Sequence, residues 1–452
     1  MTIAPDNLPA SASVAMARGD LAQAQVESID YEGHGVAHID GKAVFIDGAL
    51  PGETVVFRYH NKKKTHDTGR VVEVLRASPD RVTPRCAHYG VCGGCSLQHL
   101  RSAAQLPAKQ QVLHDALERI GKVQPMAWLT PLEGQAWGYR RRARLGVKFV
   151  EKKGGVLVGF REKRSAFITP LTFCEVLDAS VAQRLPDLKT LIEGLSCADR
   201  LPQIEVAVGD NAAALVFRHL VPLTPDDLAA LTAFGQQHGI QMWLQSGGPD
   251  SVAPLWPAQP EALVYRLPDE GVEFEFAVTD FIQVNADLNR RMVRQALALL
   301  DPQPTDNVLD LFCGLGNFSL PLARRAARVL GIEGDGRLID KARLNAQRNA
   351  IGNVEFIAAN LYTETGPDPW GDAHFDKWLL DPPRTGAAEP IRRLSPDNLP
   401  ARIVYVSCNP ATLARDAQVL VHAKGYRLSH AGVMDMFPQT SHVEAMAVFD
   451  RA

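Results

Sequence analysis

The fold of this chain is decided by NVLDLFCGLGN, residues 307–317, in its C-terminal half. The apolar run Val308 to Phe312 predicts a buried strand, and a helix is expected to begin shortly after it. Between them, Gly314 and Gly316 let a ligand approach the backbone closely, as in nucleotide-binding loops. The pattern Gly-x-Gly alone is equally typical of a tight strand-to-helix turn without a ligand, so the surrounding chain has to decide.

Two features around this loop favour a nucleoside-like cofactor. A dinucleotide fingerprint would have a third glycine at position 319, where this chain has Ser319, and this counts against pyrophosphate binding. The next predicted strand ends in Glu333, seventeen residues after Gly316, which suits a carboxylate that accepts both ribose hydroxyls.

Buried strands alternate with segments of helical length throughout this region. Such alternation predicts a parallel sheet with helices on both faces, and ligands bind at the carboxyl ends of its strands. The predicted strands are Asn307–Phe312, Arg328–Glu333, Val354–Ala358, Lys377–Asp381 and Arg402–Cys408.

Two of these strands end in residues that can carry chemistry. Asp381 is followed by two prolines and Arg384, which is either a rigid loop or, beside the glycine loop, one wall of a methyl-donor site. Cys408 follows the last strand and precedes Asn409-Pro410. An isolated cysteine is more often an inert core residue, but its place beside the cofactor loop and a carboxylate favours a nucleophile.

Glu444 precedes a final apolar strand, Ala445–Phe449, which can return it to the same sheet edge. A thiol, a methyl donor and a carboxylate base are what methylation at C5 of uracil requires. That carbon becomes nucleophilic only after a nucleophile adds at C6, and its proton must later be removed.

The chain has seven cysteines and no export signal, which indicates thiols, metal ligands or catalysis rather than disulfides. The spacing Cys86-x5-Cys92-x2-Cys95 with the distant Cys174 offers four soft ligands. Either a tetrahedral zinc ion or an iron–sulfur cluster fits them. A radical S-adenosylmethionine enzyme would have Cys-x3-Cys-x2-Cys with one iron left open, so a closed site is expected.

The N-terminal part reads as a small β-barrel after a disordered tail at residues 1–18. Short alternating strands separated by turns are predicted at Gln25–Ile29, Lys42–Ile46, Glu53–Tyr59 and Gly69–Val74.

The central region is predicted to be mixed and β-rich, with strands such as Ala143–Val150 and Gln203–Val208. The formal net charge of the chain is -3, yet the window Arg140–Arg164 contains ten Lys or Arg residues and only two Glu. This local excess favours a nucleic-acid surface.

No apolar run reaches the roughly 18 residues of a membrane span, so no membrane partner and a cytoplasmic location are expected.

Five motifs in the C-terminal region resemble, in order and spacing, the RNA uracil-5-methyltransferase family. The resemblance implies a Rossmann-like S-adenosylmethionine-dependent domain in which Cys408 attacks C6 and Glu444 removes the C5 proton. The motifs are FxQxN at 281–285, DLFCGxGN at 310–317, DPPR at 381–384, SCNP at 407–410 and HVE at 442–444. The residues implied to contact S-adenosylmethionine are Gln283, Phe312, Asn317, Glu333, Asn360 and Asp381.

The N-terminal part also resembles a TRAM domain, an OB-like RNA-binding barrel, at residues 26–35, 51–53 and 62–64. Within the family, a TRAM barrel together with a four-cysteine [4Fe-4S] cluster is typical of enzymes acting on 23S rRNA, and the tRNA-modifying relative lacks both. The resemblance therefore implies 23S rRNA as substrate and a monomer without an obligate protein partner. A tRNA uracil-5-methyltransferase or, less so, a non-catalytic RNA-binding protein are the alternatives.

The chain is thus expected to be a multidomain α/β protein. Residues 19–79 would form the TRAM barrel, residues 80–268 a mixed β-rich iron–sulfur and RNA-binding domain, and residues 269–452 the Rossmann-like methyltransferase domain. The [4Fe-4S] ligands would be Cys86, Cys92, Cys95 and Cys174.

Overall fold

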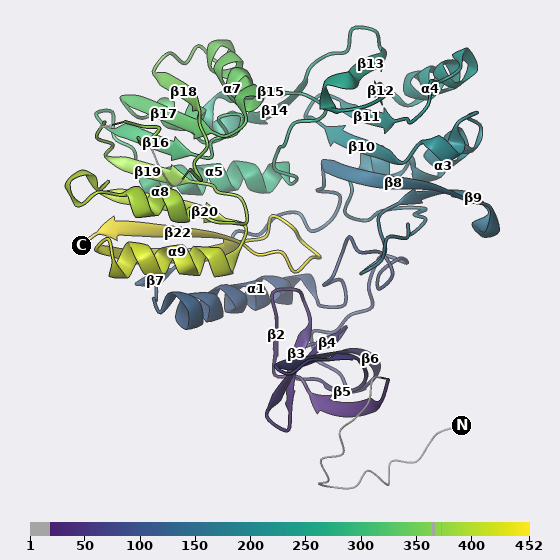
Figure 1. Ribbon diagram of the computed structural model, residues 1–452, viewed down its shortest axis with the longest axis horizontal. Helices are drawn as coiled ribbons and strands as arrows, with labels where there is room; N and C mark the ends of the chain where they lie inside the picture. The colour runs from purple at the N-terminus through teal and green to yellow at the C-terminus, as the bar shows by residue number, and fades with distance from the viewer. Residues whose placement is uncertain (1–18, 364–366, 372) are drawn as a thin grey trace. The chain divides into compact units, whose positions relative to one another are not determined.

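The computed structural model describes residues 19–363, 367–371 and 373–452 (Figure 1). The expected tail at residues 1–18 lies outside the described residues. The chain divides into two compact units, one formed by residues up to Thr83 together with His99–Arg101, and one formed by the remainder. Each is described here by itself.

The N-terminal unit is a six-stranded sheet in the order β1-β5-β6-β4-β3-β2. The sheet packs around a small core that includes Val26, Val44 and Phe57. The single strand expected at Gln25–Ile29 is wrong in extent. The N–H of Val26 donates to Glu53 O and its C=O accepts from Gly52 N, so that β1 ends at Gln25 and β2 begins at Ser28. The strands are β1 (Leu21–Gln25), β2 (Ser28–Ile29), β3 (Gly35–Ile39), β4 (Lys42–Asp47), β5 (Thr54–Lys62) and β6 (His66–Arg76).

A buried ion pair fixes the end of this unit. Glu53 is fully buried, and its carboxylate accepts hydrogen bonds from Arg81 at 2.6 and 2.8 Å and from the backbone N–H groups of Leu50 and Ser78. Burial alone would raise the pKa of Glu53, but these four donors outweigh it and lower that pKa.

A second six-stranded sheet, in the order β13-β12-β11-β10-β8-β9, forms the central region. Helix α3 (Leu185–Glu193) and helix α4 (Pro225–His238) accompany it, as does the single turn α2 (Ala179–Ala182). The strands are β8 (Arg142–Val150), β9 (Gly155–Gly159), β10 (Gln203–Val208), β11 (Ala213–Arg218), β12 (Ile240–Gln245) and β13 (Val252–Trp256).

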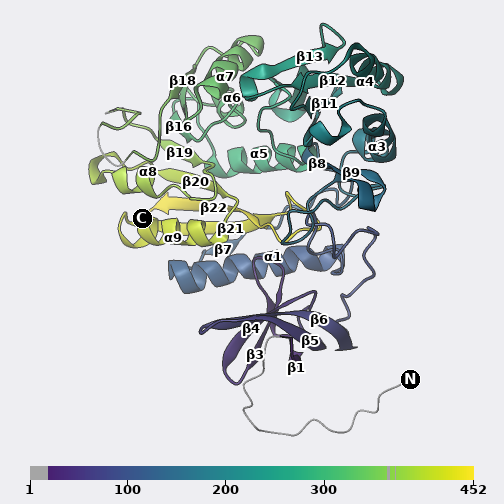
Figure 2. The same ribbon diagram turned by 45° about the vertical axis from the view of Figure 1, so that its right-hand side comes forward.

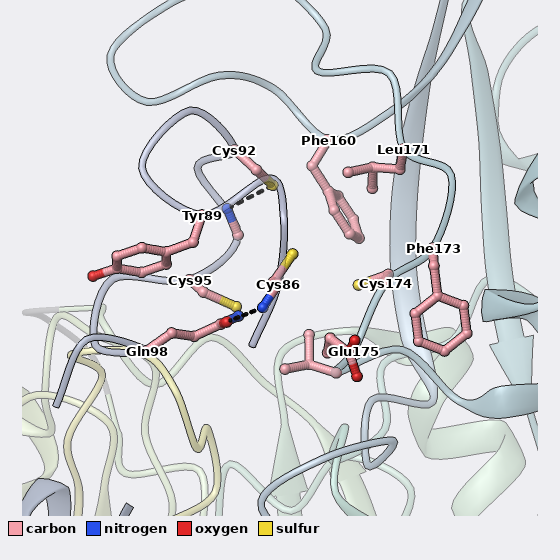
Figure 3. A pocket seen from close by; sticks show the side chains of 12 residues that line it. Cys86, Tyr89, Cys92, Cys95, Gln98, Phe160, Leu171, Phe173, Cys174 and Glu175 are labelled. Atoms are coloured by element: carbon pink, nitrogen blue, oxygen red, sulfur yellow. Dashed lines mark hydrogen bonds between the residues drawn. The ribbon is translucent and has the colours of Figure 1, made fainter. Parts of the chain in front are cut away.

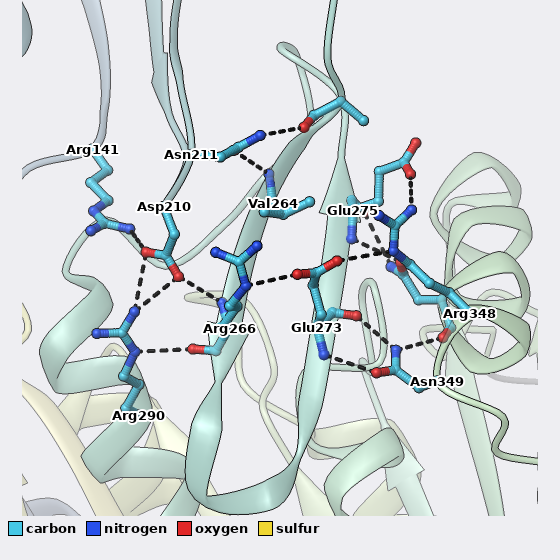
Figure 4. Close-up of polar contacts among 12 residues, drawn as sticks. Arg141, Asp210, Asn211, Val264, Arg266, Glu273, Glu275, Arg290, Arg348 and Asn349 are labelled. Carbon is cyan, nitrogen blue, oxygen red and sulfur yellow. Dashed lines mark hydrogen bonds and ion pairs between the residues drawn. The ribbon is translucent and has the colours of Figure 1, made fainter.

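A hairpin of β14 (Leu263–Leu267) and β15 (Val272–Phe276) connects the central sheet to the C-terminal helices. Figure 4 shows its polar contacts: Asp210 accepts hydrogen bonds from Arg141 and Arg290, and Glu273 accepts from Arg266 and Arg348. The Arg266–Glu273 pair lies within the hairpin, and the other three pairs join residues far apart in the sequence.

The C-terminal sheet has eight strands in the order β18-β17-β16-β19-β20-β22-β21-β7. The first five are parallel, as predicted, and β22 is antiparallel to β20 and β21. The strands are β16 (Asn307–Leu311), β17 (Arg328–Glu333), β18 (Val354–Ala358), β19 (Lys377–Leu380), β20 (Arg402–Ser407), β21 (Tyr426–Met434), β22 (Glu444–Arg451) and β7 (Ala127–Trp128).

Helices cover both faces of this sheet, as Figure 2 shows for α5 on one side and α1 and α9 on the other. Apolar residues of α5, α6 and α7 form one core cluster with the sheet, and those of α1, α8 and α9 form another. The bounds are α1 (Ser102–Ala116), α5 (Ala286–Leu300), α6 (Ser319–Ala323), α7 (Gly336–Arg348), α8 (Ala388–Arg393) and α9 (Pro410–His422).

Helix α1 and strand β7 come from the central stretch of the sequence but pack with the C-terminal sheet. Leu106 and Leu113 of α1 belong to the same core cluster as Leu413 of α9, and β7 pairs with β21. The segment after the cysteine-rich stretch is therefore part of the support of the C-terminal sheet. Among the described residues, no helix combines the length and apolarity needed to cross a membrane.

Candidate active site

Three neighbouring strands end at one edge of the C-terminal sheet. The registers of β17, β16 and β19 place Glu333, Phe312 and Asp381 next to one another, since each lies at or directly after the last paired position of its strand. The backbone N–H of Phe312 donates to Ile332 O at 2.8 Å, and that of Asp381 donates to Leu311 O at 3.3 Å. Three of the six residues expected to contact the cofactor therefore lie in one row.

The glycine loop folds over this row. Gly314 and Gly316 have φ angles of +55° and +87°, which a residue with a side chain rarely adopts. The carboxylate of Glu333 accepts from the N–H groups of Gly314 at 3.2 Å, Gly334 at 2.7 Å and Asp335 at 3.1 Å. A Cβ built on Gly314 or Gly334 would meet no atom within 4 Å, so there is open space beside the carboxylate. This cradle fits a nucleoside whose ribose hydroxyls donate to Glu333.

Asn317, at the end of the loop, is held by residues that the sequence did not single out. Its amide exchanges two hydrogen bonds of 3.0 Å with the amide of Asn289 on α5, and the hydroxyl of Tyr265 donates to its Oδ1 at 3.2 Å. Only one amide hydrogen of Asn317 has no partner among these contacts. Its side chain is thus oriented by the protein before any cofactor binds.

Of the two remaining expected cofactor residues, Asn360 lies on the segment after β18, and Gln283 lies on the segment that leads into α5. Gln283 lies two residues before Asn285, whose side chain caps α5 by accepting from Leu288 N. Asn360 is exposed just after β18, and its Oδ1 accepts from Tyr362 N at 3.0 Å. Because the ring of Tyr362 is 5.8 Å from that of Phe312, the Asn360 segment borders the row of strand ends.

Cys408 and Glu444 meet at the same edge through strand pairing. Ser407 of β20 lies opposite Ala445 of β22 in an antiparallel register, so the next residues outward are Cys408 and Glu444. Asn409 caps α9 by accepting from Ala411 N at 3.1 Å, which ends the strand at the cysteine. Cys408 is partly exposed and Glu444 is 9% exposed.

The acidic groups of this edge interact electrostatically. Burial raises the pKa of Cys408 to about 12, and Glu444 and Asp381 add to the rise while Arg384 opposes it. Burial, followed by the charge of Asp381, raises the pKa of Glu444 to about 8, and burial followed by Glu333 raises that of Asp381 to about 7. Both carboxyls therefore exchange protons near neutral pH, which suits general acid–base chemistry.

Two basic side chains lie beside the acidic edge. Arg384 donates to His442 Nδ1 at 2.9 Å, and desolvation followed by Arg384 lowers the pKa of His442 to about 4, so the imidazole is neutral. Lys109 of α1 is buried and donates to Asp435 at 2.6 Å and to Phe437 O at 3.0 Å. Its positive charge acts on Glu444 and opposes the rise of the Glu444 pKa.

The four cysteines at 86, 92, 95 and 174 line one pocket, and Figure 3 shows their sulfur atoms around a shared space. Burial raises the pKa of Cys92 to about 11 and of Cys95 to about 12, and the neighbouring thiols raise both further. Gly94 N donates to Cys92 Sγ at 3.4 Å, and Gln98 Oε1 accepts from Cys86 N at 3.0 Å. Backbone donors to sulfur favour thiolates that bind a metal.

The spacing of these sulfur atoms is wide. A tetrahedral zinc ion with Zn–S bonds of about 2.3 Å would bring its four sulfurs to within about 4 Å of each other. Within the described ranges, groups of three potential ligand atoms all within 4.8 Å of one another occur at Asp30, Glu32 and His34 and at His114, Asp115 and Glu118, not among these cysteines. Four thiols around one pocket are a ligand set that suits either an iron–sulfur cluster or a zinc ion.

Part of the basic window is paired with acidic side chains of the sheet. Arg141 forms an ion pair with Asp210, and Arg142 and Arg144 approach Glu205 at 3.7 and 2.9 Å. Three of the ten basic residues of the window are thus paired with acidic side chains distant in sequence, and the interpretation of the window as an RNA surface stays a prediction. The exposed basic residues of the window include Lys148, Lys152, Lys153 and Arg161.

The sequence reasoning missed Asn289, Tyr265 and Lys109. Asn289 lies four residues after Asn285, on the same face of α5, and that spacing was the available signal. Lys109 lies 326 residues before its partner Asp435, and no local pattern could connect them.

Known proteins resemble this chain over most of its length. Residues 262–365 and 370–452 match the family model described as tRNA (Uracil-5-)-methyltransferase, and residues 18–58 match the TRAM domain. Among solved structures, the Pyrococcus abyssi tRNA (uracil-54, C5)-methyltransferase in complex with S-adenosyl-L-homocysteine is 25% identical. The similarity covers 94% of this chain and 99% of that one, with a TM-score of 0.72.

Curated relatives match over nearly their whole length. The 23S rRNA (uracil(1939)-C(5))-methyltransferase RlmD of Aromatoleum aromaticum is 54% identical over 95% of this chain and 99% of its own. The RlmD of Methylococcus capsulatus is 53% identical over 95% and 96%. With this identity over nearly the full length, the chain belongs to the RNA uracil-5-methyltransferase family, within the group of the RlmD enzymes.

Proposed function

We propose that this chain transfers a methyl group from S-adenosylmethionine to C5 of a specific uridine in 23S rRNA, giving 5-methyluridine. The observation that carries the proposal is the register that sets Cys408 opposite Glu444 at the strand edge where Asp381 and the glycine loop lie. The substrate assignment rests on the RlmD relatives and on the TRAM match.

When bound, S-adenosylmethionine supplies an electrophilic methyl group. The chain supplies the other functions. Cys408 adds to C6 of the uracil, which makes C5 nucleophilic. The pKa of Cys408 near 12 means that the thiol must lose its proton on substrate binding, and Arg384 favours the thiolate. After C5 has bonded to the methyl group, Glu444 accepts the C5 proton, and the electrons of that C–H bond re-form C5=C6 as the Cys408 thiolate leaves.

The proposed cofactor contacts are the six residues expected from the sequence. Glu333 would accept from the ribose hydroxyls, and Phe312 would contact the adenine with its partly exposed ring. Asp381, between Phe312 and β20, would border both cofactor and uracil. Gln283, Asn317 and Asn360 complete the set.

RNA binding would use the barrel and the exposed part of the basic window. Lys63 and Lys64 are exposed between β5 and β6, and Lys62 lies 4.3 Å from the ring centre of Tyr59. Exposed Lys153 lies near the exposed ring of Phe167, 69% of which is accessible. Cations and aromatic rings together suit phosphates and unstacked bases. The target uridine would be flipped out of the RNA toward the strand edge that carries Cys408 and Glu444. An rRNA substrate implies a cytoplasmic location.

The four-cysteine pocket is proposed to hold a [4Fe-4S] cluster. The four thiols around one pocket support a metal site, and the family resemblance of the sequence favours the cluster over zinc. No step of the methyl transfer uses it.

The proposal is tested by incubating the purified chain with unmodified 23S rRNA, unmodified tRNA and methyl-labelled S-adenosylmethionine. Label in 23S rRNA that disappears with Cys408→Ala and persists with Cys197→Ala, a buried cysteine outside the edge, is the expected result. Label in tRNA alone would overturn the substrate, and label that survives Cys408→Ala would overturn the mechanism.

A further inference from the structure

The loop that delivers Glu444 is held from outside the C-terminal sheet. Residues 435–443 connect β21 to β22, and Glu444 is the first residue of β22. Within this loop Gln439 is 1% exposed and has a φ of +67°, a left-handed conformation that is unfavourable for a residue with a side chain. Such a backbone persists only when surrounding contacts fix it.

The cysteine-rich segment supplies the first set of these contacts. The backbone N–H groups of Ser96 and Leu97 both donate to Gln439 O at 3.0 Å. The hydroxyl oxygen of Ser96 accepts from the N–H of Ser441, three residues before Glu444, at 2.8 Å. Ser96 directly follows Cys95, so the segment that holds the loop is also the segment that carries a proposed cluster ligand.

Helix α1 supplies a second set of contacts. Gln105 is buried, its Oε1 accepts from Gln439 N at 2.9 Å, and its Nε2 donates to Leu97 O at 3.1 Å and to Gln439 Oε1 at 3.0 Å. Lys109, one turn further on, bonds to Asp435 and to Phe437 O. Both ends of the loop are therefore fixed before Glu444 is reached.

The segment around Ser96 is in turn fixed across the cysteine pocket. Gln98 accepts from Cys86 N at 3.0 Å, as Figure 3 shows, and its side chain also bonds to Cys95. Tyr89, which lines the same pocket, donates from its hydroxyl to Ser96 O at 2.7 Å. Movement of Cys86 or Cys95 would thus move Ser96.

We propose that Ser96 is a positioning residue for the removal of the C5 proton: it couples the four-cysteine pocket to Glu444 through Gln439 and Ser441. The inference rests on the proposed function and adds a task for the pocket, which is to keep the catalytic base in register. Substrate binding and attack by Cys408 do not depend on this coupling.

The reaction order gives the coupling a specific signature. Proton removal by Glu444 comes after the Cys408 thiolate has added to C6 and after C5 has received its methyl group. If Glu444 is displaced, the C5–H bond stays intact, the thiolate cannot leave, and methylated RNA stays bound to the enzyme. A misplaced base therefore predicts a covalent complex that survives denaturation, and not only a lower rate.

The test compares Ser96→Ala, Ser96→Thr and Thr172→Ala in the full chain. Thr172 is an exposed residue near the cysteine pocket whose hydroxyl contacts His88 and not the loop. We expect Ser96→Ala to lower kcat about tenfold with unchanged KM for RNA, and to accumulate labelled RNA–protein complex on a denaturing gel. Ser96→Thr, which keeps the hydroxyl, and Thr172→Ala should behave as wild type.

Iron and sulfide content is measured in each variant, and Gln105→Met provides a second disturbance of Gln439, from α1, that keeps Ser96 but also removes the hydrogen bond to Leu97 O. Complex accumulation in both Ser96→Ala and Gln105→Met at full iron content is the expected result. Wild-type kcat without complex in Ser96→Ala would overturn the inference, as would a rate loss that follows lost iron and is missing from Gln105→Met. Wild type and Glu444→Gln are run alongside, and inactive wild type would overturn the proposed function itself.

Discussion

The two cysteine sites of this chain have thiols with similarly raised pKa values but different neighbours. Burial is the main cause in both, and it raises the pKa to about 12 for Cys408 and for Cys95. Cys408 lies among Glu444, Asp381 and Arg384, whereas Cys95 lies among three further cysteines. Burial alone therefore does not identify a nucleophile. The neighbouring side chains distinguish the two sites, because carboxyl groups can accept and donate protons, whereas grouped thiols can bind metal cations.

The largest expected effect tests the carboxyl side of this comparison. Glu444→Gln removes the base but keeps the shape of the side chain, so we expect methylation turnover to fall by about 10²- to 10³-fold. Single-turnover methyl transfer should persist, and the covalent complex should accumulate. Asp450→Asn, at the other end of β22, is the control and should keep near-normal turnover.

The next largest effect tests the grouped thiols. Cys95→Ser should lose iron and sulfide and lower Tm by more than about 5 °C, because the buried ligand pocket would lack its cations. Cys197→Ala, which changes a buried cysteine that packs in the central core, should keep its iron. Retention of full iron content by Cys95→Ser would contradict the assignment of that residue as a ligand.

The pH dependence separates catalysis from stability. The folded-state pKa values of Glu444 and Asp310, about 8 for each, lie above their ordinary values of 4.5 and 3.8. The folded chain therefore keeps protons that the unfolded chain releases in this interval. These groups should stabilise the fold most at low pH and lose that contribution as pH rises to about 8, by at most about 1.4 kcal/mol per pH unit each.

The turnover rate should move the other way, rising up to about pH 8 as Glu444 becomes a free carboxylate. Denaturation midpoints and steady-state turnover rates measured between pH 6 and 9 would check both trends. A turnover rate that falls over this interval would contradict Glu444 as the base.

The smallest expected effect is on the free energy of unfolding, and it compares a buried carboxyl group that is protonated with one that accepts several hydrogen bonds. Asp310 is fully buried and largely protonated at pH 7, so Asp310→Asn should change the free energy of unfolding by less than about 1 kcal/mol. Asp227 is also buried, but hydrogen bonds from Ser196 and Thr224 outweigh burial and lower its pKa to about 2. Asp227→Asn should cost about 1–3 kcal/mol, as urea denaturation would show.

Much of the C-terminal fold was predictable because its strands are apolar runs that end in distinctive residues. The strands at Arg328–Glu333 and Val354–Ala358 agree with the structure residue for residue, and the other three differ by one residue at their ends. Parallel pairing then brings the strand ends together, which is why Phe312, Glu333 and Asp381 could be grouped from sequence alone.

The rest depended on contacts that no local pattern encodes. The joining of α1 and β7 to the C-terminal sheet follows from contacts across hundreds of residues. Strand β21 pairs with the nearby β22, and the sequence analysis did not predict it. The same holds for the acidic partners of the basic window and for Lys109 beside Glu444. The roles of the site residues and the boundaries at 79/80 and 268/269 remain proposals.

The central claim, attack by Cys408 followed by proton removal by Glu444, is tested most directly with RNA that contains 5-fluorouridine. Fluorine at C5 leaves no proton to remove, so elimination is blocked after methyl transfer. On this RNA we predict a denaturation-resistant complex carrying the labelled methyl group with wild type and with Glu444→Gln, and none with Cys408→Ala. On ordinary RNA the complex should accumulate with Glu444→Gln and not with wild type. A complex that forms with Cys408→Ala, or none with a wild-type enzyme that methylates ordinary RNA, would contradict the account.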